Sequence, residues 1–488
     1  MDFVELLPVF MFGALAILLF SGYPVAFILG GVGLAFGVIG IFSGEFMFIQ
    51  FRSLPSRIFG GIMESLILTA IPMFIFMGTM LEKSGIARDL LNCLQVLLRR
   101  VPGGLALAVT LMGTILAATT GIIGASVIMM SLLALPVMLK RNYDAELATG
   151  TIAASGTLGI LIPPSIMLVI MADLLSRSVG NLFVAAVFPG LMLASLYFAY
   201  IVIRCTINPS LAPPLPKDIG PQTTMGVLGM VLRSFVPPVI LIACVLGSIL
   251  GGLATPTEAA GVGALGAILL GLFNLVLLPA MGIKEIHFDG EADSKLIGHA
   301  ATGGIGAELK YFWDTLKDVI ERTALTNAMI FGIFIGATLF SFVFRSLGGD
   351  DLVIDAVEAL GLGSWGLLFL IMGLVFVLGF FFDWIEITLI VLPVFAPAIA
   401  LLDFGDHVAK FEVTYWFAIL LAVNLQTSFL TPPFGFALFY LKAVAPKSVK
   451  IQQIYRGIIP FVMLQLVGLA MVAIFPEIAL WLPRQLFN

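Results

Sequence analysis

Oxygen-bearing side chains gather at four places within long apolar stretches of this 488-residue chain. Hydroxyl, amide and carboxylate oxygens are hard donors that suit a cation such as Na⁺, while the N-termini of half-helices offer donors to an anionic solute. We therefore predict that the four groups together bind Na⁺ and solute. Their members are Thr119, Thr120, Gly121 and Ser126; Ser155, Gly156, Thr157, Pro163, Pro164 and Ser165; Asp383, Glu386 and Thr388; and Asn424, Gln426, Thr427, Ser428, Thr431, Pro432 and Pro433.

Asp383 is the strongest single candidate for an ion ligand, and we predict a Na⁺ site at its carboxylate. It lies in a run of apolar and aromatic residues, where a buried charge needs a partner or a cation. The alternatives are a solvated hairpin tip or a structural ion pair, and Glu386, one turn further on, could equally face solvent. A lone Ser or Thr in a membrane helix is more often a packing residue. The prediction therefore depends on the convergence of all four groups at breaks in the chain.

Other features have structural interpretations. Glu258 follows Pro256 in the first turn of a helix, where an acid complements the helix dipole, so we predict a capping role. The three cysteines and three histidines show no metal-binding spacing. The sequence contains no Gly-x4-Gly-Lys-Ser/Thr, Gly-x-Ser-x-Gly or His-Glu-x-x-His motif and no long basic tract. These patterns do not support an enzyme, a nucleotide cofactor or nucleic-acid binding.

The composition requires lipid as the solvent. Hydrophobic residues make up 60% of the chain and charged residues only 11%, far below the usual quarter of a soluble domain. A span needs roughly 20 apolar residues, so the chain has room for about ten spans and their loops. The fold class is therefore predicted as an all-α integral membrane protein. Segments 45–64, 85–100 and 346–361 mix charge with apolar residues and are predicted to be interfacial helices.

Four apolar runs do not fit a single straight span. Runs 103–139 and 363–402 are too long for one span and short for two, which favours re-entrant helical hairpins. Runs 145–175 and 413–441 each contain a double proline. Proline removes a backbone donor and disfavours helical geometry in the residue before it, so both spans are predicted to break in mid-membrane.

The same order of features occurs twice. Each half contains an opening span, an interfacial helix, a hairpin, a broken span and a closing span, and each half is predicted to cross the membrane five times. An odd number of crossings turns the second half upside down, which is typical of secondary transporters. We predict a first inverted repeat at 1–208, a linker at 209–233, and a second repeat at 234–488 with a cytoplasmic insertion at 282–322.

Basic residues predict the orientation. Placing Lys140 and Arg141 in the cytoplasm puts most of the 24 Lys and Arg residues there by alternation, in agreement with the positive-inside rule. The residues left on the outer side are Arg52, Arg57, Arg177, Arg345, Lys410 and Arg484.

Seven motifs in order resemble the large membrane subunit of tripartite ATP-independent periplasmic (TRAP) transporters. They are Ala70-Ile71-Pro72-Met73-Phe74, Val101-Pro102-Gly103-Gly104-Leu105-Ala106, the stretch from Ala154 to Ser165, Pro189-Gly190-Leu191, the stretch from Ala254 to Ala260, Phe381-Phe382-Asp383 and Leu430-Thr431-Pro432-Pro433-Phe434-Gly435.

The resemblance covers nearly the whole chain. It implies an elevator-type importer in the bacterial inner membrane, driven by a Na⁺ gradient and without other cofactors. It also implies two partners, a periplasmic substrate-binding protein and a small four-helix membrane subunit, and small organic acids as solutes. By the same resemblance, Asp383 matches the acidic position of the family's cation site.

The sequence differs from the family pattern in two places, and two other functions are considered. Residues 384–388 replace the small residues common after the acid and look like a subgroup that takes keto acids and other monocarboxylates. The segment 282–322 is longer and more polar than usual, and Trp313 is predicted to lie on a surface helix. The runner-up function is a stand-alone elevator-type symporter of organic anions without a binding protein. An ion channel is a third interpretation, less well served by two hairpins and two broken spans.

Overall fold

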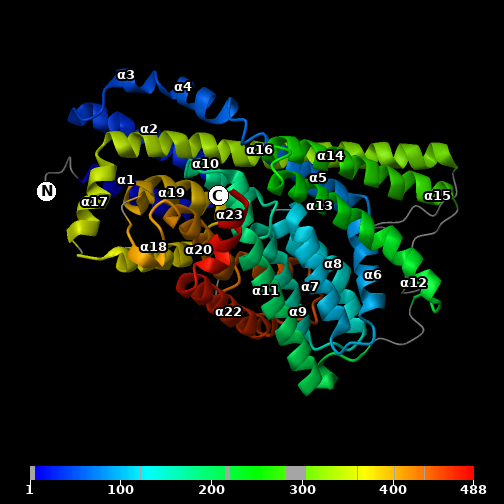
Figure 1. The fold of residues 1–488 in the computed structure, drawn as a ribbon. Coiled ribbons are helices and arrows are strands. Elements are labelled where there is room, and N and C mark those ends of the chain that lie inside the picture. Colours follow the sequence, from blue (N-terminus) through cyan, green and yellow to red (C-terminus); the bar gives the residue numbers. More distant parts are fainter. Residues whose placement is uncertain are drawn as a thin grey trace.

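The computed structural model describes residues 6–120, 123–214, 220–281, 304–359, 361–400, 402–432 and 435–487. Within these ranges every regular element is helical, and seven helices are long and apolar enough to cross a membrane. Shorter apolar helices include Gly104–Leu116, Ser364–Leu378 and Trp384–Phe395 in the predicted hairpins and Val413–Ser428 in the second broken span, while Ile123–Lys140 of the first hairpin is one of the seven. The predicted all-α membrane fold is confirmed (Figure 1).

Both long apolar runs form pairs of helices. The first pair is α7 (Gly104–Thr120) and α8 (Ile123–Lys140), and the second is α18 (Ser364–Leu378) and α19 (Trp384–Ala400). Each arm is shorter than the roughly 20 residues of a straight span. The two arms of each pair also pack against each other, so both runs are hairpins, as predicted.

Both double-proline spans are broken. The first consists of α9 (Ala145–Thr157), the short 3₁₀ turn η2 (Leu158–Ile160) and α10 (Ile166–Leu174), and the second of α20 (Val413–Ser428) and α21 (Phe436–Val444). The helices stop ahead of Pro163 and Pro432, since a proline cannot donate to the preceding turn. The predicted breaks are confirmed. The peptide between Pro163 and Pro164 is cis.

We call the helices around the hairpins the frame. Its elements are α1 (Leu7–Leu19), α2 (Val25–Ser43), α3 (Phe48–Phe51), α4 (Leu54–Ile58), η1 (Phe59–Met63), α5 (Ala70–Lys83), α6 (Ile86–Leu97), α12 (Thr224–Met230), η4 (Val231–Phe235), α13 (Val236–Leu250), α14 (Pro256–Leu272), η5 (Phe273–Leu277), α15 (Leu278–Ala280), α16 (Ile305–Ser346) and α17 (Gly349–Ala359). Figure 1 shows α16 running across the upper part of the view, below α3 and α4, and it packs against α2 and α5.

We call the remaining helices the hairpin unit. Besides the two hairpins and the two broken spans, it contains α11 (Val179–Ile207), η3 (Pro209–Leu211), η6 (Gly405–His407), α22 (Ile451–Ile474) and α23 (Glu477–Phe487). In Figure 1 these helices lie below α16. The unit therefore contains every element that carries a predicted site residue.

Helix α16 differs from the sequence prediction. The sequence predicts a polar insertion at 282–322 followed by a separate span, whereas one helix of 42 residues runs from Ile305 to Ser346. No Gly or Pro interrupts residues 307–331, so nothing ends the helix between its polar and apolar parts. At 1.5 Å per residue it is about 63 Å long. Trp313 is exposed on its polar part, and residues 282–303 lie outside the described residues.

The start of α14 shows the predicted cap. Thr255 is the N-cap residue and its hydroxyl accepts a hydrogen bond from the Glu258 N–H at 3.3 Å. The Glu258 carboxylate in turn accepts from the Thr255 N–H at 2.8 Å. This reciprocal pair is a capping box, so the structural role predicted for Glu258 is confirmed.

Helices of the two halves interlock within the hairpin unit. Arm α8 packs against α21, arm α19 packs against α10, and α9 packs against α22. The α9–α22 contact is close because a Cβ at Gly150 would collide with the Gly457 carbonyl and a Cβ at Gly457 with the Glu146 carbonyl. Each half therefore supports a hairpin arm of the other half. The repeat boundaries and the inverted orientation of the second half stay predictions.

Two ion pairs in the described part of the chain each join segments that the positive-inside argument assigns to the same side. Lys83 of α5 lies 2.8 Å from Asp318 of α16, both predicted to be inside. Arg484 of α23 lies 2.6 Å from Glu412, both predicted to be outside. The predicted orientation itself is not tested by these contacts, but they are compatible with it.

Candidate ion and solute site

The two broken spans meet at buried polar side chains. Gln426 of α20 donates from Nε2 to the Thr157 hydroxyl of α9 at 3.3 Å and to the Tyr197 hydroxyl at 3.5 Å. Gln426, Thr157 and Tyr197 have no exposed surface. This contact joins residues 269 apart in the chain, so the polar ends of the two half-helices lie together. We call this contact the crossing.

The first hairpin packs against the end of α9. Ser155 donates to the Thr110 hydroxyl of α7 at 3.4 Å, and a Cβ on Gly156 would lie 2.5 Å from a Val127 methyl of α8. Ser126 is buried on the same arm. The side chains of Thr119 and Thr120, and all of Gly121, lie outside the described residues.

The connection after η2 is fully buried. Pro163, Pro164 and Ser165 are buried. The Ser165 hydroxyl donates to the Ile160 carbonyl at 2.5 Å. That bond satisfies a carbonyl whose helical partner would be Pro164, which has no N–H. Ser165 therefore stabilises the break.

The second hairpin packs against α20 in a related way. Asn424 donates from Nδ2 to the Met372 carbonyl of α18 at 2.8 Å, and a Cβ on Gly379 would collide with the Ser428 hydroxyl. Thr427 donates to the Val423 carbonyl and Thr431 to the Thr427 carbonyl, each at 2.8 Å. Pro432 follows directly, while Pro433 lies outside the described residues.

Two carboxylates lie together at the tip of the second hairpin. Asp383 precedes α19, and its Oδ1 accepts a hydrogen bond from the Trp384 N–H at 2.8 Å. Glu386, one turn on, accepts from the Asp383 N–H at 3.3 Å. Among the described residues neither carboxylate forms an ion pair with a Lys or Arg. Like charges this close repel each other unless a cation or protons offset them.

Two oxygens of the predicted set are buried without a hydrogen-bond partner in the described part of the chain. They are Oγ1 of Thr388, on α19, and Oε1 of Gln426, at the crossing. Burying a polar atom without a partner costs about 1–3 kcal/mol. An oxygen left in this state is a candidate ligand for a cation, and both belong to the sequence-predicted groups.

Tyr440 of α21 belongs to this region, and the sequence analysis missed it. Its ring packs against Gly124 of the first hairpin, with ring carbons 3.0 Å from where a Cβ of Gly124 would be. Tyr440 therefore packs the second broken span against the first hairpin. Its place one helical turn into the half-helix after Pro433 was the available signal.

Glu386 can be reached through a groove on the frame side. It lines an apolar groove of about 960 Å³ together with residues of α2 and α16. Beside this groove, Gly336 of α16 approaches the Ala26 carbonyl of α2 too closely for a side chain. Asp383 and Glu386 at the tip of the second hairpin are half-buried.

The family of the chain is shown by comparison with known proteins. The model described as "Tripartite ATP-independent periplasmic transporter, DctM component" matches residues 12–478. The C4-dicarboxylate TRAP transporter large permease protein of Pseudomonas aeruginosa is 29% identical over 89% of this chain and 90% of its own.

Other relatives carry different names. The isethionate TRAP transporter permease protein DctMQ of Oleidesulfovibrio alaskensis is 27% identical over 98% of this chain and 67% of its own. The ectoine TRAP transporter large permease protein of Halomonas elongata is 26% identical over 95% of this chain and 96% of its own.

A solved structure shares the fold. The YdaH transporter of Alcanivorax borkumensis superposes with a TM-score of 0.55 at 14% identity, covering 89% of each chain. The family match extends over almost the entire sequence, and the relatives are transporter permeases, not enzymes. The chain therefore belongs to the DctM-component family of tripartite ATP-independent periplasmic transporters, as a multi-pass subunit of the inner membrane.

Proposed function

We propose that this chain is the translocating subunit of a Na⁺-coupled secondary importer of small organic acids, which a periplasmic binding protein delivers. One observation carries the proposal: Asp383 and Glu386 lie together at a hairpin tip, and neither pairs with a basic residue in the described chain. Intramembrane carboxylates are costly and mark ion pathways.

Na⁺ is the cation that this donor set favours. Carboxylate, hydroxyl and amide oxygens surround the hairpin tip and the crossing, including the unpartnered oxygens of Thr388 and Gln426. Small hard cations prefer oxygen ligands, and one positive charge between two carboxylates removes their mutual repulsion. In this proposal, Na⁺ binding draws the second hairpin onto α20 and completes the solute pocket.

The proposed solute is a small anion with an acid group. The solutes named for the relatives, a C4-dicarboxylate, isethionate and ectoine, each contain a carboxylate or a sulfonate. Half-helices α10 and α21 begin within the protein interior after the breaks. The first N–H groups of α10 have no helical partners and can donate to an oxyanion, whereas in α21 the Ala437 N–H already donates to the Phe429 carbonyl at 3.3 Å. The keto-acid subgroup stays a prediction within this class.

The proposed movement is of the elevator type. The hairpin unit interlocks internally through α8–α21, α19–α10 and α9–α22, so it can slide as a body along the frame. Inward movement of one net positive charge at 100 mV contributes about 2.3 kcal/mol, or roughly fiftyfold in accumulation.

The proposed partners follow from the family. Its name denotes three components, and the isethionate relative DctMQ is a longer chain, of which the match covers 67%. We expect the small four-helix subunit of this transporter to be a separate chain, and a binding protein to supply the solute.

Proteoliposomes with the large and small subunits test the proposal. We expect uptake of organic acids only with an inward Na⁺ gradient and loaded binding protein. Uptake driven equally well by K⁺ would overturn the Na⁺ assignment. Na⁺-driven uptake of free solute without binding protein would instead establish the stand-alone symporter.

A further inference from the structure

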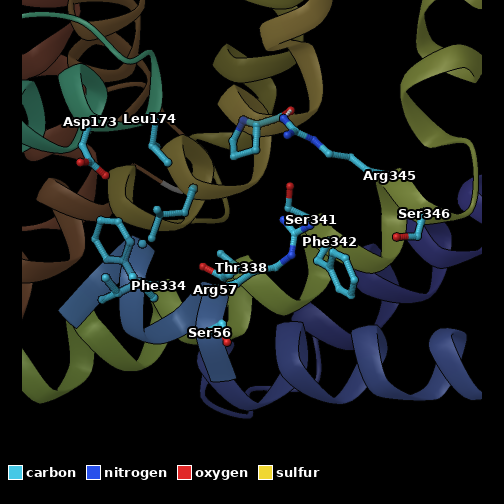
Figure 2. Close-up of a pocket in the computed structure, with 16 residues that line it drawn as sticks. Ser56, Arg57, Asp173, Leu174, Phe334, Thr338, Ser341, Phe342, Arg345 and Ser346 are labelled. Carbon is cyan, nitrogen blue, oxygen red and sulfur yellow. Dashed lines mark hydrogen bonds between the residues drawn. The ribbon is translucent and has the colours of Figure 1, made fainter. Parts of the chain in front are cut away.

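A cavity of about 800 Å³ lies between the frame and the hairpin unit, away from the crossing (Figure 2). On the frame side it is lined by α4, η1 and α16, and on the other side by the end of α10 and by α19. None of the residues predicted to bind Na⁺ or solute lines it. Its basic residues, Arg57 and Arg345, are both assigned to the outer side by the positive-inside argument.

Arg57 lines the cavity as an exposed side chain and has no acidic partner among the described residues. Its guanidinium lies over the Phe342 ring, 4.4 Å from the centroid. No ion pair or hydrogen bond joins it to another described residue. A cation–π contact uses the face of the guanidinium and leaves its in-plane N–H groups free. These groups form the planar fork that binds carboxylates and sulfonates.

Arg345 extends into the same cavity from the end of α16. Its Nη2 donates to the Pro393 carbonyl of α19 at 2.8 Å, and its Nε lies 3.6 Å from Asp350. The Pro393 carbonyl is open to Arg345 because the residue four positions later is Pro397, which has no N–H. Arg345 has five N–H groups, so these contacts leave some of them for a third acceptor.

Neutral donors complete the lining. Ser56, Thr338 and Ser341 belong to the wall that carries the two arginines, and Figure 2 shows the Ser341 hydroxyl pointing toward the space between them. Asp173, at the end of α10, is the carboxylate of the lining and accepts a hydrogen bond from Ser65 at 3.3 Å. The frame wall is therefore cationic and rich in donors.

We propose that this cavity is a separate anion-binding site, in which Arg57 and Arg345 hold the acid group of an incoming solute before it reaches the crossing. The inference rests on the proposed import function for its direction. An oxyanion between the two arginines gains charge-assisted hydrogen bonds from Arg57, and from the N–H groups of Arg345 that Pro393 and Asp350 do not use. The solute class is a small carboxylate or sulfonate.

Thiol labelling tests the site directly. Ser341→Cys is made in a Cys244→Ser background, since Cys93 and Cys205 are buried, and the assembled transporter is labelled with a sulfonate-bearing and a trimethylammonium-bearing methanethiosulfonate. We expect the sulfonate reagent to be favoured, and succinate, pyruvate or isethionate to slow labelling.

Replacing Arg57 should reduce the preference of Ser341→Cys for the sulfonate-bearing reagent. Arg57→Gln is expected to lower the anion-to-cation labelling ratio about tenfold, the equivalent of one charge-assisted hydrogen bond. Arg57→Lys should keep part of the preference. Arg52→Gln removes a charge from the same predicted side without touching the cavity, and should leave the ratio unchanged. Equal ratios for Arg57→Gln and Arg52→Gln, or no protection by any of the three anions, would overturn the site.

Uptake separates this inference from the proposed function. We expect Arg57→Gln to slow Na⁺-driven uptake at sub-saturating loaded binding protein, relative to Arg52→Gln. Na⁺-driven uptake that is the same in both variants leaves the proposed function standing and rejects the cavity as a step on its path. Anion-dependent labelling in a protein that shows no Na⁺-driven uptake rejects the proposed function and retains the anion site.

Discussion

Asp383 can cap α19 and bind a cation with different oxygens of one carboxylate. Its Oδ1 accepts the Trp384 N–H, and Asn caps helices about as well as Asp. Asp383→Asn should therefore fold with little loss of stability and bind Na⁺ much more weakly. A unit charge 4 Å away is worth about 4 kcal/mol at an effective dielectric of 20, so we expect the half-saturating Na⁺ concentration for uptake to rise at least about tenfold.

The matched control for this change is Asp403→Asn. Asp403 lies after the same hairpin, and its Oδ1 accepts the Gly405 N–H at 2.9 Å. The control should keep the wild-type response to Na⁺. If Asp383→Asn and Asp403→Asn show the same Na⁺ dependence, Asp383 is a cap and nothing more.

A second prediction concerns Thr388, whose replacement should raise stability and weaken Na⁺ binding. Its hydroxyl oxygen is buried without a partner in the described chain, so Thr388→Val removes a desolvation cost of about 1–3 kcal/mol. We expect a higher Tm in Na⁺-free detergent and weaker Na⁺ activation of uptake. Thr427→Val, which deletes a hydroxyl bonded to the Val423 carbonyl, should not raise Tm. Unchanged Na⁺ activation in Thr388→Val would remove Thr388 from the ion site.

Among the helices, the contact of α9 with α22 depends on glycine. A Cβ at Gly150 would collide with the Gly457 carbonyl, and overpacking of this kind typically costs about 1–3 kcal/mol. Gly150→Ala should therefore lower Tm in detergent. Gly261→Ala on α14, where nothing lies within 4 Å, should hold or raise Tm because Ala is the better helix former by about 1 kcal/mol. Equal Tm shifts in the two variants would show that the close contact between α9 and α22 does not contribute to stability.

The positions of the helix breaks could be predicted from the sequence, but the full extent of α16 could not. Double prolines stop a helix through local covalent geometry, so both breaks can be predicted from Pro163 and Pro432 alone. The extent of α16 was missed because charged residues suggest a loop, although nothing between residues 307 and 331 breaks a helix. Charge tells which part of a helix meets water, whereas Gly and Pro tell where a helix ends.

For the whole molecule, the elevator proposal requires the hairpin unit to move along an undivided frame. A bifunctional thiol reagent that joins Ser341→Cys of α16 to Leu389→Cys of α19, which line one cavity, should abolish uptake. The comparison is Ala26→Cys with Gly332→Cys inside the frame, where the Cβ positions lie 3.6 Å apart and suit a disulfide. We expect that disulfide to leave uptake intact. Full uptake with the first pair joined would exclude sliding between α16 and α19.

The site's residue types could be predicted from the sequence, but its contacts could not. Hydroxyl, amide and carboxylate groups at chain breaks were sufficient to nominate Thr157, Gln426 and Asp383, whose role in binding stays a prediction. The bond between Gln426 and Thr157 spans 269 positions and depends on how the two halves pack, which no local pattern encodes. Tyr440 was missed for the same reason, because its ring meets Gly124 of the other half only in the folded chain.

The prolines of α19 also limit what can surround this arm. Pro393 and Pro397 deprive the carbonyls of Leu389 and Pro393 of their usual helical donors. Arg345 supplies one donor in the present arrangement, and it belongs to the frame. In the elevator proposal the arm slides, so that oxygen would leave Arg345 behind, and hydrocarbon offers no substitute. Solvent must therefore accompany this face of the arm along its whole route, which makes the corridor beside α19 a wet one that lipid tails cannot fill.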